Sequence, residues 1–178
     1  MIQNKKSVLF ATLVMATSMH SAFAADPVSS TGGTVQFTGA IIDSPCVVEV
    51  GQEGIVPVEL GRYTTDLFPQ VGATSPAKAF SISLENCDTT TYKHASLTFS
   101  GDTANETALN VEGGAAGVGI QIMKDGTALK VDGTEASSSY ELVDGSNKLD
   151  LEAQYISIAD EVTAGEANGT ADFIVNYL

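Results

Sequence analysis

The residues best suited to chemistry in this chain are its two cysteines, Cys46 and Cys87. Two thiols can form a disulfide, contribute to a metal site, or stay unrelated inside a core. A metal site built on two cysteines needs further ligands, usually histidines, and neither cysteine lies in histidine-rich sequence. We therefore predict a disulfide between Cys46 and Cys87 and no metal site, with two unrelated buried thiols as the alternative.

The sequence offers few residues for acid–base or nucleophilic catalysis. Beyond the leader described below, the only histidine is His94, which stands next to Lys93 and has no recognisable catalytic partner. No serine lies in a nucleophile-elbow motif. The glycine-rich stretch 113–119 lacks the Gly-Lys-Ser/Thr ending of a phosphate-binding loop, and we interpret it as a flexible turn. We predict no enzymatic activity, no catalytic residue and no cofactor, and a secreted hydrolase is the disfavoured alternative.

Residues 1–24 have the pattern of a secretory signal peptide. Two lysines precede an apolar run over 8–15, and the sequence Ala-Phe-Ala ends at Ala24 in the small-x-small form of a cleavage site. Polar residues interrupt the apolar run, whereas a membrane anchor needs about 20 continuous apolar residues. We expect cleavage after Ala24 and export into an oxidising compartment, which favours the predicted disulfide.

The chain is strongly acidic. It has 8 Lys plus Arg and 22 Asp plus Glu, a formal net charge of −14, and the expected loss of the leader removes two lysines and leaves −16. Such a surface repels nucleic acid and anionic lipid, so we predict no nucleic-acid partner. The remaining 154 residues correspond to one domain with a substantial core.

Apolar and polar residues alternate along much of the chain, as in strands with one buried face. No segment has a sustained helical period, and only 63–71 offers a helical turn. Pairs of aspartate and glycine at 125–126, 132–133 and 144–145 predict tight hairpins, because glycine accepts a positive φ. We predict an all-β, two-sheet sandwich with loops at 101–106 and 113–117. The predicted strands cover 34–41, 46–50, 55–60, 79–86, 95–100, 118–124, 128–131, 138–143, 149–158 and 170–177.

The first and last predicted strands form a complementary pair. The last strand is apolar on one face, and we expect its next edge to be open, which is an aggregation hazard unless another strand covers it. The first strand could fold back onto its own domain or enter another molecule, where burying its three large apolar residues would contribute roughly 5–9 kcal/mol. The positions on these faces are Val35, Phe37, Gly39 and Ile41 in the first strand and Phe173, Val175 and Tyr177 in the last.

Several local motifs accompany this pair of strands. A glycine, Gly165, stands fourteenth from the C-terminus, and Tyr177 is penultimate. The segments GTVQFTG (33–39), VELG (58–61) and FSISLENC (80–87) lie around the two cysteines. With the leader and the cysteine pair, these features resemble the major subunits of chaperone-usher pili, the type 1 pilin family, over essentially the whole chain.

The resemblance implies an incomplete immunoglobulin-like β-sandwich that lacks its last strand and is completed by a donor strand from another subunit or a chaperone. It divides the chain into a signal peptide (1–24), an N-terminal donor-strand extension (25–41) and a pilin domain (42–178). Val35, Phe37, Gly39 and Ile41 would be the donor positions, with Gly39 permitting a close approach. Gly165, Phe173, Val175 and Tyr177 would contact chaperone and donor alike.

The same resemblance implies a function and partners. The chain would be a structural subunit of a fimbria at the cell surface that polymerises by donor-strand exchange and supports cell adhesion. Its partners would be neighbouring subunits in a homopolymer, a periplasmic pilus chaperone and an outer-membrane usher. A minor adaptor or a tip-associated adhesive pilin of the same kind of assembly is the alternative.

Overall fold

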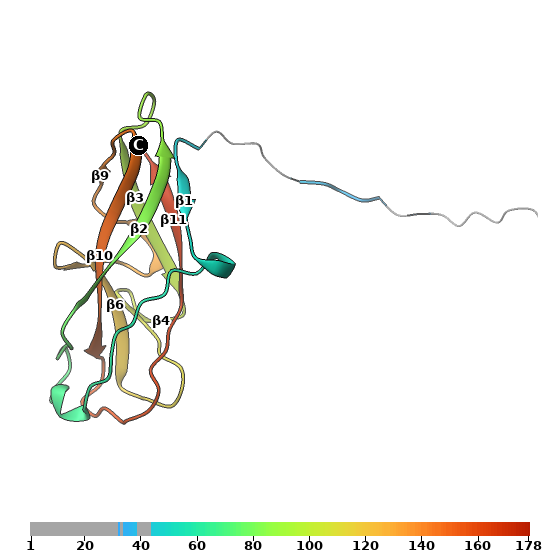
Figure 1. Cartoon of the computed structure of the whole chain (residues 1–178). Coiled ribbons are helices and arrows are strands. Elements are labelled where there is room, and N and C mark those ends of the chain that lie inside the picture. Colours follow the sequence, from blue (N-terminus) through green and yellow to red (C-terminus); the bar gives the residue numbers. More distant parts are fainter. Residues whose placement is uncertain (1–31, 33, 39–43) are drawn as a thin grey trace, which may run out of the picture. The chain divides into compact units, whose positions relative to one another are not determined.

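The computed structural model describes Gly32, residues 34–38 and residues 44–178 (Figure 1). The chain falls into two units, Met1–Ala40 and Ile41–Leu178, and each is described by itself. In the first unit, residues 34–38 form no helix or strand, and the side chains of Val35 and Phe37 are 73% and 91% exposed. The leader and the predicted donor positions Gly39 and Ile41 lie outside the described residues.

The second unit is a sandwich of two antiparallel sheets, as predicted. The larger sheet has the order β1 (Val47–Glu49), β2 (Lys78–Cys87), β10 (Gly145–Ser157), β6 (Val118–Lys124), β5 (Ala108–Leu109) and β4 (Thr103–Asn105), and β7 (Thr127–Ala128) pairs with β6. The smaller sheet has the order β11 (Ala171–Tyr177), β3 (His94–Gly101) and β8 (Asp132–Ala136), and β9 (Tyr140–Glu141) pairs with β3. Two 3-10 turns complete the described elements, η1 (Gln52–Gly54) and η2 (Thr65–Leu67).

The core lies between the two sheets. Its largest fully buried apolar side chains are Ile82, Leu84, Leu97, Leu149 and Val131, and they come from both layers. On β2, β3 and β10 these residues alternate with polar ones, so each strand turns one face inward. Each such side chain contributes about 1.5–3 kcal/mol to stability on burial.

The sandwich has two ends that matter below. The upper end of Figure 1 is where β2 and β11 finish and β10 begins, and we define it by residues 44–45, 88–93 and 142–146. The lower end is where β10 finishes and β6 begins, and we define it by residues 64–72 and 158–163. A hydrogen bond from Gly72 N to Ser157 O (2.8 Å) joins the first of these segments to the last residue of β10.

Most strand predictions are confirmed, and the exceptions have a physical reason. Strand β6 has the predicted bounds, the pair at 125–126 closes the β6–β7 hairpin, and η2 lies within the predicted turn at 63–71. Residues 55–60 are not a strand, because no neighbouring strand pairs with them in the described part of the chain. Strand β4 lies in the loop predicted at 101–106. Of the strand predicted at 128–131 only Ala128 lies in a strand, β7, and the strand predicted at 138–143 is reduced to the two residues of β9.

Two of the predicted hairpins are also wrong. Asp132 and Gly133 belong to β8, which pairs with β3 rather than with an adjacent strand. The segments around Asp144 and Gly145 do not pair with each other; instead the Asp144 carboxylate accepts hydrogen bonds from the distant Thr89. Among the described residues, no helix has the length and apolar character needed to cross a membrane.

Candidate strand-accepting groove

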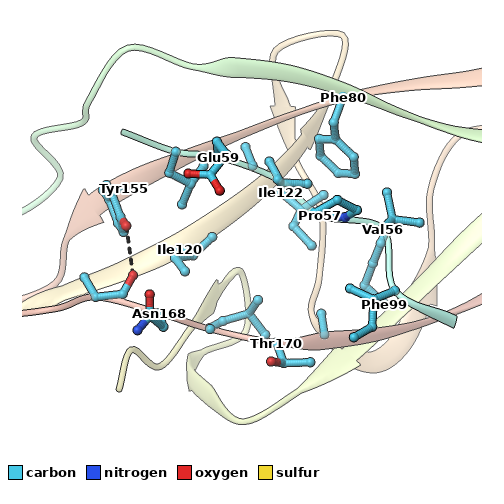
Figure 2. A pocket seen from close by; sticks show the side chains of 18 of the residues that line it. Val56, Pro57, Glu59, Phe80, Phe99, Ile120, Ile122, Tyr155, Asn168 and Thr170 are labelled. Carbon is cyan, nitrogen blue, oxygen red and sulfur yellow. Dashed lines mark hydrogen bonds between the residues drawn. The ribbon is translucent and has the colours of Figure 1, made fainter. Parts of the chain in front are cut away.

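A groove of about 1380 Å³ runs along one side of the sandwich (Figure 2). Strand β11 and the residues before it, 162–170, line one wall. An extended segment, 55–63, lines the other wall. Side chains of both sheets form the floor, so the groove opens onto the space between the two layers.

The first wall is a strand with one free edge. Strand β11 pairs with β3 in the register Phe173 with Phe99 and Val175 with Leu97, and it has no partner on its other side within the part of the chain that the structure describes. Phe173, Val175 and Tyr177 share the inward face, pack against the core and line the groove. These three predicted accepting residues therefore lie together. Their contact with a donor or a chaperone remains a prediction.

Half-buried and exposed side chains alternate along the second wall as in a strand, but its backbone lacks the hydrogen bonds of a strand. Val56, Val58 and Leu60 are half-buried, whereas the residues between them are exposed. Among described residues, the backbone groups of 56–61 form no hydrogen bond. Backbone N–H and C=O groups are paired in nearly all buried positions of folded proteins. Both walls thus present unpaired backbone to the groove, which is the arrangement that accepts one additional strand.

The floor is apolar over much of its length. Ile82, Phe99, Ile120 and Ile122 lie there with less than a tenth of their surface exposed, and Phe80 is half-buried (Figure 2). Phe99 also contacts the first wall, with its ring centroid 6.3 Å from that of Phe173. A strand with large apolar residues on alternate positions matches this floor.

The groove becomes polar toward the start of β11, around Tyr155. The Tyr155 hydroxyl donates to the carbonyl oxygen of Ala167 (2.8 Å), and its ring packs edge-to-face on Tyr63. Burial raises the pKa of Tyr155, and the nearby Glu166 carboxylate, Tyr63 and the Glu59 carboxylate raise it further. Tyr155 therefore stays a neutral hydrogen-bond donor that fixes the wall ahead of β11.

Gly165 lies in the first wall where the backbone is crowded. A Cβ added there would come within 2.2 Å of the Ala115 nitrogen and 2.3 Å of the Gly114 carbonyl carbon. Distances this short force a backbone shift, so a glycine is needed for packing. Gly165, a predicted accepting residue, lies in the groove lining, and its near neighbours are the loop residues 114–115. Its contact with a donor or a chaperone stays a prediction.

The glycine-rich loop 113–117 is a wall support that sequence reasoning missed. It is hydrogen-bonded to the first wall through Glu166 N to Gly113 O (3.1 Å), Ala115 N to Glu166 O (3.1 Å) and a reciprocal pair between Ala116 and Thr163. A Cβ atom on Gly113 would also collide with Glu166 of the wall, and one on Gly117 would collide with Glu161, directly before the wall. The loop predicted at 113–117 is confirmed, and its docking on the wall was not predicted. The available signal for that docking was the high density of glycines in both segments.

Tyr177 closes the upper part of the groove. Its ring lies 6.4 Å from the ring of Tyr92, measured between centroids, and its hydroxyl oxygen is buried. That oxygen has no hydrogen-bond partner among the described residues. The main-chain groups beside it are secured by Leu178, whose carbonyl oxygen accepts from the nitrogens of Lys93 and His94, both at 3.1 Å.

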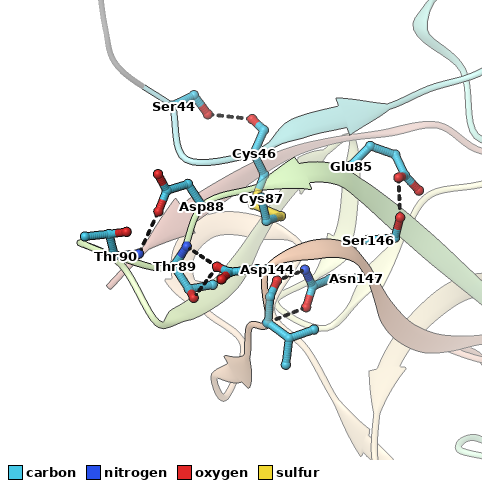
Figure 3. The surroundings of a disulfide bond; sticks show 11 residues. Ser44, Cys46, Glu85, Cys87, Asp88, Thr89, Thr90, Asp144, Ser146 and Asn147 are labelled. Carbon is cyan, nitrogen blue, oxygen red and sulfur yellow. Dashed lines mark hydrogen bonds between the residues drawn. A yellow bond between two sulfur atoms is a disulfide. The ribbon is translucent and has the colours of Figure 1, made fainter.

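The predicted disulfide between Cys46 and Cys87 is present at the upper end (Figure 3). It joins the residue before β1 to the last residue of β2, and Asp88 N donates to Pro45 O (2.8 Å) beside it. The bond closes a loop with a sequence separation of 41 residues. Loop closure of that size stabilises the folded state by about 4 kcal/mol in the chain-entropy model. The bridge thus anchors the strand that leads into the second wall.

Two aspartates brace the loops around this disulfide. Asp144 accepts hydrogen bonds from Thr89, from its hydroxyl at 2.6 Å and its N–H at 2.9 Å, and these bonds lower the pKa of Asp144. The hydroxyl and N–H of Thr90 likewise lower the pKa of Asp88. Both carboxylates are therefore charged at neutral pH, and they hold the upper loops in one arrangement. In the described ranges, no cluster of three or more His, Cys, Asp or Glu side chains has the geometry of a metal site.

Comparison with known proteins identifies the family. The family model for fimbrial proteins matches residues 35–178. The chain is 41% identical to a probable major fimbrial subunit, LpfA, of Escherichia coli O157:H7, over 97% of each chain. It is 37% identical to the type-1 fimbrial protein, A chain, of Escherichia coli K12, over 82% of this chain and 84% of that protein.

Solved structures give the same picture. A chaperone-usher pilus structure aligns with a TM-score of 0.65 and 26% identity, covering 86% of this chain and all of that one. The P pilus rod subunit PapA shares the fold, with a TM-score of 0.64, 23% identity, and coverage of 76% of this chain and all of that one. The chain therefore belongs to the fimbrial protein family and is a structural subunit of a fimbria at the cell surface.

Proposed function

We propose that this subunit polymerises by donor-strand exchange, in which residues 35–41 of one copy fill the groove of the next. The observation that carries the proposal is a pair of walls that face one another across an apolar floor: β11, which has one free edge, and residues 56–61, whose backbone groups form no hydrogen bond among the described residues. An inserted strand would give both walls a hydrogen-bonding partner and would cover the half-buried Phe80, Phe173 and Val175.

The N-terminal segment has the properties that such a donor needs. Val35 and Phe37 are exposed on alternate positions, and Gln36 separates them. Burying each of these two apolar side chains would contribute about 1.5–3 kcal/mol. The transfer is heterologous, because one copy gives the strand and the next receives it, so repetition produces an open fibre.

A subunit with an open groove and an exposed Phe37 needs a temporary occupant before assembly. Exposed strand edges and apolar side chains drive non-specific association. A periplasmic chaperone that lends its own alternating strand would protect the groove, and an outer-membrane usher would exchange that strand for the next subunit's. The name of the matched chaperone-usher pilus supports this route for the present chain.

A second role, as a minor adaptor or tip-associated pilin, rests on one further comparison. The chain is 35% identical to the CupB6 tip adhesin of Pseudomonas aeruginosa over 74% of its own length, with a TM-score of 0.61, but it covers only 38% of that protein. Copy number separates the two roles. A subunit that dominates the mass of sheared filaments is the shaft protein, whereas a trace component is not.

Substitutions at neighbouring donor positions test the exchange. Phe37→Asp places a charge on the apolar face of the donor, and we expect it to abolish fibres, as deletion of 25–41 also should. Gln36→Asp introduces the same charge on the opposite face and should leave fibres intact, since successive strand residues point to opposite sides. Electron microscopy and the yield of sheared filaments measure both variants. Normal fibres from Phe37→Asp or from the deletion would refute donor-strand exchange.

A further inference from the structure

The first wall of the groove contains two neighbouring residues that can react with each other. Asn168 is the only asparagine of the chain that is followed by a glycine, Gly169. The backbone nitrogen of a glycine can attack the side-chain amide carbon of the preceding asparagine, because glycine has no Cβ to hinder the approach. The pair lines the groove directly after Ala167, whose carbonyl oxygen accepts the hydrogen bond from Tyr155 (Figure 2).

Both reacting groups lack hydrogen bonds among the described residues. Asn168 is exposed, and its side-chain amide has no partner there. The side-chain amides of Asn105, Asn147 and Asn176, by contrast, each form hydrogen bonds. The Gly169 N–H also donates no hydrogen bond within the described ranges. An unrestrained amide therefore stands beside a backbone nitrogen that is available to attack it.

One backbone contact opposes the reaction. Glu112 N donates to Asn168 O (2.8 Å), and Asn168 N donates to Glu112 O (2.9 Å). This isolated bridge holds the extended backbone of a strand pair, whereas a ring between Asn168 and Gly169 requires a bent one. Because the bridge lies outside the named strands, it can open locally while the two sheets stay folded. The reaction therefore proceeds when this part of the wall opens.

We propose that Asn168 is a site of spontaneous deamidation that disables subunits whose groove stays empty. The Gly169 nitrogen bonds to the Asn168 side-chain carbon, and the amide nitrogen leaves as ammonia with the proton that the Gly169 nitrogen loses. Water then adds to either carbonyl of the resulting five-membered imide and opens it. The products are an aspartate or an isoaspartate at position 168, and water is the only co-reactant.

Both products place a negative charge among carboxylates. Asn168 lines a second cavity, of about 320 Å³, together with Asp102, Glu112 and Asp172. No lysine or arginine of the described residues lines this cavity. A carboxylate at position 168 would be repelled by these three side chains, since like charges at close range destabilise each other. The neutral amide is therefore the form that suits this part of the wall.

The isoaspartate also changes the path of the wall. Its backbone runs through the former side chain and is one carbon atom longer, so the neighbouring residues must shift. Gly169 has little room to do so: an added Cβ would lie 2.9 Å from Ile120 Cδ1 and 3.2 Å from Asn110 O. We expect the altered groove to accept no strand, a consequence that rests on the proposed donor-strand exchange.

Assembly should stop the reaction. A donor strand would cover the groove lining, which includes Asn168 and Gly169. It would also make local opening of the wall more costly, because a ligand that binds only the closed form stabilises that form. Subunits in a fibre therefore keep the amide, whereas unassembled subunits lose it with time.

Peptide mass spectrometry tests the site. Unpolymerised Phe37→Asp subunit and wild-type fibres are incubated in the same neutral buffer, and conversion of amide to carboxylate is followed at Asn168 and at Asn110. Asn110 is the internal control, because the branched side chain of Val111 hinders attack by its nitrogen. In the free subunit we expect Asn168 to convert at least about tenfold faster than Asn110, and at least about tenfold faster than Asn168 in fibres. Equal rates in either comparison would overturn the proposal.

Uptake of a synthetic peptide with the sequence of residues 34–41 tests the consequence separately. Fresh Phe37→Asp subunit should bind this peptide, and aged subunit should lose binding in proportion to its deamidated fraction. The added substitution Asn168→Gln keeps an amide that would have to close a larger ring, so binding should survive ageing.

The possible results distinguish this reaction from donor-strand exchange. Full binding by deamidated subunit, or an equal loss in the Asn168→Gln variant, would overturn the disabling role. Failure of fresh subunit to bind the peptide would contradict donor-strand exchange instead, and the mass spectra would still decide whether Asn168 reacts.

Discussion

The two walls of the groove share an alternating pattern of apolar residues and differ in how they are held. Strand β11 is hydrogen-bonded along one edge to β3 over seven residue pairs, from Ala171 to Tyr177. Residues 56–61 have no backbone hydrogen bonds among the described residues, and they depend on β1, the disulfide and side-chain packing for their position. The first wall is therefore already a strand of a sheet, whereas we expect the second wall to become a strand only when a partner strand pairs with it.

Of the changes considered, removal of the disulfide should reduce stability the most, and it should act on the second wall. Cys46→Ser or Cys87→Ser leaves β1 joined to β2 by their strand pairing alone and removes about 4 kcal/mol of stabilisation. We expect a sharp fall in the yield of folded subunit, measured as chaperone-bound protein in the periplasm. An unchanged yield, with an unchanged denaturation midpoint, would show that the second wall does not depend on the bridge.

Crowding at Gly165 should damage the first wall instead. Gly165→Ala places a methyl group against the backbone of 114–115, and we expect about 3 kcal/mol of destabilisation from overpacking. Gly126→Ala is the matched control: its φ of +73° makes alanine strained, but no atom lies within 4 Å of the new Cβ, so about 1 kcal/mol is expected. Urea denaturation measures both variants. Equal losses would mean that the loop 113–117 does not support the wall.

Serine substitutions on the two walls should show which wall is stabilised by assembly. Val175→Ser removes a side chain that already packs against the core, so we expect a loss of about 1–2 kcal/mol with or without a donor strand. Val58→Ser should cost less than about 0.5 kcal/mol in the free subunit and more than about 1 kcal/mol in the fibre. Denaturation midpoints of both forms provide the measurement. The same cost for Val58→Ser in both forms would mean that its surroundings do not change on assembly.

Acidification should destabilise the loops of the upper end, and we expect this loss of stability to be the smallest of the effects described. The folded-state pKa values of Asp88 and Asp144 lie below the ordinary 3.8, because both carboxylates accept hydrogen bonds from threonines. Their contribution to stability is therefore complete above pH 3.8 and is lost as the pH falls through the lowered values. Asp144→Asn should flatten this part of the curve of stability against pH. A wild-type curve that is already flat below pH 4 would contradict the bracing role.

Much of this architecture could be predicted from residue patterns, because a buried strand carries its own periodicity. Strand β6 and the final strand β11 were predictable to within a residue, and the cysteine pair followed from chemistry and compartment. The second wall was predicted as a strand, since its side chains alternate, but alternation does not reveal whether a partner exists. The Asp144 contact with Thr89 and the docking of loop 113–117 join distant segments through a few hydrogen bonds and glycine packing, which leave no periodic signal.

Hydrogen exchange at residues 56–61 tests the central claim most directly, because the claim is that an incoming strand pairs with this wall. The comparison is between wild-type fibres and unpolymerised Phe37→Asp subunit, followed by mass spectrometry of peptides covering both walls. We predict that amides of 56–61 exchange rapidly in the free subunit and at least about tenfold more slowly in fibres, whereas β11 is already partly protected before assembly. Equal exchange of 56–61 in both forms would contradict the account.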